Sequence, residues 1–129
     1  MNSSAINSLY RQEILEHYRH PQNFGKLKKS SFQAYVINEL CGDEITLHLL
    51  MERGRVKNVK FSGSGCALSI ASASLFTERL KGKTWKDLKK IQTAQVTKAL
   101  GVTIGPGRKK CVLLPLQALK QILDKHGHS

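Results

Sequence analysis

Three cysteines and one aspartate are the residues of this chain best suited to chemistry. Cys41, Cys66 and Cys111 are an odd number of thiols at wide separations, which is a poor framework for disulfides and better suits thiol or metal chemistry in a reducing compartment. Each is expected at the boundary of an element: Cys41 before a strand, Cys66 after a strand and Cys111 before the last helix. The three thiols can therefore meet at one end of a sheet.

The expected positions of these thiols favour their charged form. A cysteine at a helix N-terminus lies at the positive end of the helix dipole, which stabilises the thiolate that attacks electrophiles and binds metals. We expect this for Cys66 and Cys111, and Lys110 adds a positive charge beside Cys111. Asp43, two residues after Cys41, can complete a tetrahedral set of three sulfurs and one oxygen, which zinc accepts. The alternative is three ordinary buried cysteines and an aspartate in a turn.

A block of strands precedes Cys66. Residues 33–37 are β-prone, and residues 44–51 alternate between apolar and polar side chains, as in a half-buried strand. Residues 52–55 turn the chain into a return strand, in which Val56 is out of phase and indicates a bulge. Three antiparallel strands are predicted, with His48 at the surface on the face away from the core.

Helices are predicted before and after the strands. Ser8 can cap a first helix that ends near Pro21, and apolar residues after Cys66 mark one face of a helix that Gly82 can terminate. The apolar stripe of the first helix is Tyr10, Ile14 and Tyr18. Further helices are expected over 84–91, over 94–100, and from Pro115 to near Gly127. The sequence therefore predicts a single α+β domain over residues 1–129, a small three-stranded antiparallel sheet with helices packed on one face.

The charge of the chain is strongly positive. Twenty-one Lys and Arg against nine Asp and Glu give a net charge of +12, which produces either a solvated surface or a field that steers an acidic partner. A nucleic-acid partner is disfavoured, because no helix-turn-helix, zinc-finger or aromatic RNA-binding pattern is present. No apolar stretch has the length of a signal peptide or a membrane span, so a cytoplasmic protein without membrane association is expected.

Four motifs together resemble one family. They are the first helix with the sequence LYRQEILEHYRHPQNFG from Leu9 to Gly25, Asn-x-x-Cys-Gly-Asp ending at Asp43, Gly-x-Gly-Cys-Ala around Cys66, and Lys110-Cys111 before a helix. Over nearly the whole chain this pattern is similar to the U-type iron-sulfur cluster assembly proteins, the IscU, SufU and NifU N-terminal family. Scaffolds of the IscU type carry a histidine where this chain has Lys110, so the SufU-like branch resembles it more.

The resemblance implies a compact α+β domain that works with a cysteine desulfurase of the SufS, IscS or NifS type and with downstream assembly or acceptor proteins. It implies that Cys41, Asp43, Cys66 and Cys111 hold zinc, or alternatively iron or a transient 2Fe-2S cluster. Such a protein carries sulfur or builds clusters and is not a conventional enzyme.

Three functions are consistent with these residues. The first is a zinc-bound sulfur acceptor, the second a scaffold for a 2Fe-2S cluster, and the third a basic binding module in which the thiols are incidental. For the first function we expect Cys41 to take the sulfur before Cys66 or Cys111, because it is predicted on a loop and they at helix starts. Lys110 is expected to stabilise the neighbouring thiolates.

Overall fold

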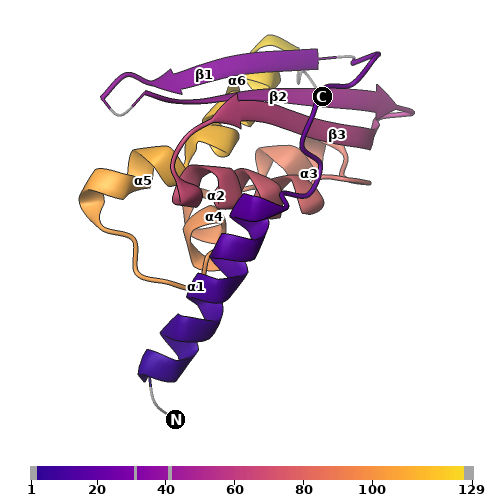
Figure 1. The fold of residues 1–129 in the computed structure, drawn as a ribbon. Helices are drawn as coiled ribbons and strands as arrows, with labels where there is room; N and C mark the ends of the chain where they lie inside the picture. Colours follow the sequence, from indigo (N-terminus) through magenta and orange to yellow (C-terminus); the bar gives the residue numbers. More distant parts are fainter. Residues whose placement is uncertain (1–2, 31, 41, 127–129) are drawn as a thin grey trace.

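The computed structural model of the chain describes residues 3–30, 32–40 and 42–126. It confirms the α+β class: a three-stranded antiparallel sheet and a layer of helices (Figure 1). Cys41 lies outside the described residues. In the part of the chain that is described, no helix has the length and apolar character needed to cross a membrane.

The sheet is a meander in the order β1-β2-β3. Its strands are β1 (Phe32–Asn38), β2 (Asp43–Glu52) and β3 (Arg55–Ser64). Arg53 and Gly54 both have positive φ, 55° and 76°, which is the two-residue hairpin geometry that matches the natural twist of paired strands. The predicted bulge is confirmed, because the register between β2 and β3 shifts where Met51 pairs with Val56.

Six helices are described. They are α1 (Ser3–Arg19), α2 (Ala67–Glu78), α3 (Trp85–Lys89), α4 (Thr93–Ala99), α5 (Pro106–Val112) and α6 (Leu114–His126). They lie on one side of the sheet, as predicted (Figure 1). Thr84 caps α3 in a capping box with Asp87, which confirms the Thr-x-x-Asp start expected from the sequence.

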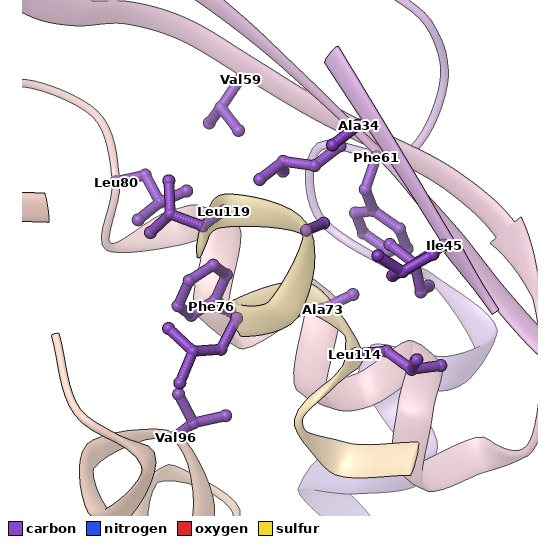
Figure 2. Close-up of a cluster of buried hydrophobic side chains, with 14 of the residues drawn as sticks. Ala34, Ile45, Val59, Phe61, Ala73, Phe76, Leu80, Val96, Leu114 and Leu119 are labelled. Carbon is purple, nitrogen blue, oxygen red and sulfur yellow. The ribbon is translucent and has the colours of Figure 1, made fainter. Parts of the chain in front are cut away.

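The hydrophobic core lies between the sheet and helices α2 and α6. Ile45 and Phe61 point from the strands toward this layer, and Ala73 from α2 and Leu119 from α6 belong to the same buried cluster (Figure 2). Ile45, Phe61, Ala73 and Leu119 are all fully buried. The alternation predicted for β2 is confirmed on this face, where Ile45, Leu47 and Leu49 have no exposed surface.

Helix α2 is the centre of the helical layer, and the prediction of a single apolar face was wrong for it. Ser69, Ser72, Ser74 and Thr77 are buried as deeply as its apolar residues. The small side chains let neighbouring elements approach from several directions, and each buried hydroxyl is hydrogen-bonded within the fold. Helix α2, which follows Cys66, is therefore packed against neighbouring elements on more than one face.

Two details of α1 also differ from the sequence prediction. The helix begins at Ser3, so Ser8 is inside it and is not its cap. Of the expected apolar stripe only Ile14 is buried, while Tyr10 and Tyr18 are 37% and 43% exposed. The end of α1 is held to α2 by a 2.7 Å hydrogen bond between His17 Nδ1 and Ser74 Oγ.

His48 is buried, at 6% exposure, which contradicts the prediction of a surface residue. The chain after α1 pairs with the outer edge of β3 at Phe24 and Gly25 and then reaches β1 on the far side of β2 (Figure 1). This segment passes over the sheet face that carries His48. Burial, and to a smaller degree the charge of Lys26, lower the pKa of His48.

Candidate metal centre

Asp43, Cys66 and Cys111 come together at one end of the sheet. One ligand atom from each lies within 4.8 Å of the others. Asp43 is the first residue of β2, Cys66 is the N-cap residue of α2, and Cys111 belongs to α5. The three residues are 23 and 45 positions apart in the sequence, so only the tertiary structure brings them together.

The donor set suits zinc. Two thiolates 2.3 Å from one tetrahedral ion lie about 3.8 Å apart, so the observed separations of up to 4.8 Å need only a small contraction. Asp43 and Cys111 are 5% and 3% exposed, and burying such groups together is costly unless their charges are paired or bound to a cation. A fourth ligand would complete the tetrahedron. Cys41, predicted for that role, lies outside the described residues.

Backbone contacts fix the orientation of Asp43. The backbone N–H of Cys66 donates to Asp43 Oδ1 over 3.3 Å. A Cβ at Gly65 would lie 3.0 Å from Asp43 Cγ and would overlap Ser69 Oγ. A Cβ at Gly63 would collide with the backbone of Glu44. The two glycines are therefore needed for β3 and the start of α2 to approach β2.

Cys66 lies where the sequence placed it. It has extended backbone geometry immediately before α2 and is half-buried. Its Sγ is 3.8 Å from Ser69 Oγ, and Ser69 donates to the carbonyl of Cys66 over 3.0 Å. The first turn of α2 thus supplies backbone N–H groups and the positive end of a twelve-residue helix near this sulfur.

The prediction for Cys111 was wrong in one respect. Cys111 is not at the start of a helix but near the end of the short helix α5, where the dipole disfavours a negative charge. No helix was predicted over these residues, although Pro106 at the first turn of α5 is a typical start signal. The dipole argument therefore applies to Cys66 but not to Cys111. Lys110 is exposed, so its charge is largely screened by water.

Asn38, the first residue of the Asn-x-x-Cys-Gly-Asp motif, stabilises Cys111 directly. Asn38 Nδ2 donates to Cys111 Sγ over 3.5 Å, while Asn38 Oδ1 accepts from the backbone N–H of Leu40 over 3.2 Å. Because Leu40 supplies a donor, the oxygen of the amide must face it, and the NH₂ group must face the sulfur. The backbone carbonyl of Asn38 also accepts from Gly42 N–H over 2.7 Å. Asn38 therefore links the β1–β2 loop to Cys111.

A surface hollow of about 400 Å³ opens beside the site. Its lining includes Ile37, Leu40, Lys110 and Leu114. Leu40 is 86% exposed and Ile37 is 43% exposed, which is unusual for large apolar side chains next to one another. The hollow also borders Asn38 and Glu39, at the end of β1.

Comparison with known proteins identifies the family. The model of the NifU-like N terminal domain matches residues 9–128. The chain belongs to this family. The match covers nearly all of the chain and includes every residue of the candidate site.

Relatives within the family carry two kinds of name. The zinc-dependent sulfurtransferase SufU of Bacillus subtilis is 33% identical over 95% of this chain and 95% of its own length. The iron-sulfur cluster assembly scaffold protein IscU of Thermotoga maritima is 35% identical over 94% of this chain and 96% of its own length. The resemblance to the IscU, SufU and NifU family is thus confirmed, with relatives from both branches.

A solved structure confirms the fold. The putative SUF-system scaffold protein of Fervidobacterium islandicum superposes with a TM-score of 0.74 at 28% identity, over 87% of this chain and 94% of that one. The family is one of iron-sulfur cluster assembly.

Proposed function

We propose that this protein is a sulfur acceptor in iron-sulfur cluster assembly, with zinc held by Cys41, Asp43, Cys66 and Cys111. The observation that carries the proposal is the convergence of Asp43, Cys66 and Cys111, whose ligand atoms lie within 4.8 Å of one another. The kinship with a zinc-dependent sulfurtransferase supports the same assignment.

Zinc bound to these residues would keep the thiols as thiolates and protect them from oxidation. The protein contributes the geometry: Asp43 is oriented by the backbone N–H of Cys66, and Cys111 by the amide of Asn38. A carboxylate is a harder and more weakly held ligand than a thiolate in a sulfur-rich site. Asp43 therefore makes the site exchangeable.

The transferred group is the outer sulfur of a persulfide on a cysteine desulfurase. A thiolate of this protein attacks that sulfur, so that a new S–S bond forms while the S–S bond to the desulfurase cysteine breaks. The desulfurase cysteine leaves as a thiolate, the transferred outer sulfur keeps its own proton, and no external oxidant or reductant is consumed. The product is a persulfide on this protein.

Cys41 is the acceptor we favour. Its chain neighbours Leu40 and Gly42 are both exposed, whereas Cys66 is half-buried and Cys111 is 3% exposed. Cys66 is tethered at the start of α2, and Cys111 is bonded to Asn38. An incoming persulfide reaches a sulfur on an exposed loop more easily than either of these.

The desulfurase would approach the end of the sheet that carries the site. Exposed Leu40 and the surface hollow beside it offer an apolar contact. Lys109 and Lys110 lie on the exposed side of α5 next to Cys111 and can steer an acidic partner toward it. Added salt should weaken this association, because it shortens the screening length below the ~8 Å of physiological ionic strength.

Metal analysis and mass spectrometry test the proposal together. The purified protein should contain about one zinc per chain without visible absorbance, and Asp43→Ala and each cysteine-to-alanine variant should lose most of it. After incubation with a cysteine desulfurase, cysteine and pyridoxal phosphate, the added sulfur should be found on Cys41. Full zinc content in every variant, or a persulfide on Cys111 with Cys41 unmodified, would contradict the proposal.

The scaffold relatives favour one alternative, assembly of a 2Fe-2S cluster on the same residues. It predicts a different result in the same samples. Protein purified without oxygen would be brown and would contain iron and sulfide in place of zinc. Alanine at Cys41, Cys66 or Cys111 would remove the colour.

A further inference from the structure

A second hollow lies away from the candidate metal centre. It has a volume of about 380 Å³ and opens between α2, the chain after α3, and α4. Phe76, Ile91, Val96 and Ala99 provide its apolar walls. Ligand-binding clefts in proteins have volumes of about 300–1,000 Å³, so the hollow is in the range of a small-molecule site.

Half of the residues that line this hollow are polar, but Arg79 and Gln95 are exposed and the buried lining is mainly apolar. Phe76 and Val96 are each 5% exposed, and they form the deep wall. Ser72 also lines the hollow, but its hydroxyl donates to the carbonyl of Val112 over 2.6 Å. The buried part therefore favours a hydrocarbon group over a polar one.

Two cations stand at the rim. Arg79 is the exposed C-cap residue of α2, and Lys83 is half-buried on the turn that follows. Within the described residues, neither side chain forms an ion pair with a carboxylate. The carboxylate of Asp87 accepts a hydrogen bond from the backbone N–H of Thr84 over 3.2 Å and lies near enough to Lys83 to interact with its charge. A guanidinium at such a rim matches a carboxylate, which it can bind through two parallel hydrogen bonds.

We propose that this hollow binds a small amphiphilic carboxylate, with an aliphatic chain against Phe76 and Val96 and the carboxylate at Arg79 and Lys83. At about 30 Å³ for each non-hydrogen atom, the volume of a water molecule in the liquid, 380 Å³ accommodates roughly a dozen such atoms. A saturated acid of about ten carbons has that size. None of the residues that line this hollow is a proposed metal ligand.

The experiment uses the full chain as purified, with decanoate as the probe. Decanoate is titrated into ¹⁵N-labelled protein, and the backbone amide shifts are followed by NMR. We expect saturable shifts confined to residues of α2 and α4 around the hollow, with a Kd of about 0.1–1 mM, the range given by about 0.4 kcal/mol per atom for a ligand this small. Decanol, which has the same chain without the charge, should bind about tenfold more weakly.

Two variants, each with a control, test the apolar walls and the charged rim separately. Ala99→Phe fills the hollow and should abolish binding, while Ala94→Phe, an exposed position on the same helix, should not change it. Arg79→Gln should weaken decanoate binding about tenfold without affecting decanol, and Arg11→Gln on α1 is its charge-matched control. If Ala99→Phe does not fold, the Arg79 variant and decanol decide the question.

Several results would overturn the proposal. They are the absence of saturable shifts at 10 mM decanoate, shifts located outside α2 and α4, equal affinity for decanol and decanoate, or equal binding by the Arg79→Gln and Arg11→Gln variants. A failure of the zinc proposal is distinguishable from a failure of this one, because the readout here is binding at residues that are not proposed metal ligands.

Discussion

Asn38 is expected to raise the metal affinity of the site without being a ligand. Its NH₂ group lies 3.5 Å from Cys111 Sγ, and a hydrogen bond to a charged group contributes about 1.5–3 kcal/mol. Removal of that donor in Asn38→Ala should therefore reduce zinc affinity by about 10–100-fold. This is the loss commonly seen when an outer partner of a metal ligand is removed.

Asn38→Asp should have a larger effect than Asn38→Ala. The aspartate keeps an acceptor for the N–H of Leu40 but places a negative oxygen where the NH₂ group was. Two unit charges separated by the observed 3.5 Å repel by about 1 kcal/mol in water and about 5 kcal/mol at an effective dielectric constant of 20. Asn38 is half-buried, so the repulsion expected in Asn38→Asp lies between these two values.

The assay is competition for zinc with a chromophoric chelator at fixed pH, with the melting temperature of each metal-free variant measured alongside. Asn58→Asp is the matched control, because Asn58 is on β3 opposite Leu50, toward the other end of the sheet from Asp43. Cobalt(II) provides a second readout. At saturating metal, its sulfur-to-metal absorption band should shift in Asn38→Ala, which a general loss of stability would not cause.

Two results would refute this reasoning. If Asn38→Ala bound zinc within twofold of the unmodified protein, the hydrogen bond to Cys111 would have no energetic role. If Asn58→Asp lost as much affinity as Asn38→Asp, the effect would come from the added charge and not from its position beside the sulfur.

Three further predictions concern packing and protonation. Gly65→Ala should lower zinc affinity and cost about 1–3 kcal/mol of stability, because its Cβ would press on Asp43 and Ser69. Denaturation and zinc titration test this, with Gly107→Ala as the control, because a Cβ at Gly107 has open space and should lower neither the stability nor the zinc affinity. Burial lowers the pKa of His48 below 6.5, so the unfolded chain binds more protons and the free energy of unfolding should fall as the pH drops below about 7. Urea melts at several pH values should show this fall, and a fall of the same size in His48→Gln would contradict the assignment. Leu119→Ala, at a fully buried position, should cost about 2–5 kcal/mol in a urea melt, and a loss below 1 kcal/mol would contradict the packing.

Local patterns in the sequence were sufficient for most of the fold. The alternation in β2, the turn after Glu52 and the capping box at Thr84 all depend on residues within a few positions of one another. Such short-range signals determine how each segment folds. The motifs around Asp43 and Cys66 were likewise enough to recognise the family.

The outcome for the site was mixed. Three of its residues, Asp43, Cys66 and Cys111, were named from the sequence and do meet. The role of these three residues as metal ligands, the place of Cys41 among the ligands and the assignment of Lys110 remain predictions. The position of Cys111 within α5 was not predicted, because a seven-residue helix is too short to show a clear apolar periodicity.

Only the tertiary structure decided the surroundings of these groups. Asn38 and Cys111 are 73 positions apart, and nothing in their local sequence indicates that the amide faces the sulfur. His48 follows the alternation of β2 to the outer face, yet it is buried because a segment from before β1 passes over that face. A periodic pattern specifies which way a side chain points, whereas its exposure and partners depend on what the rest of the chain places there.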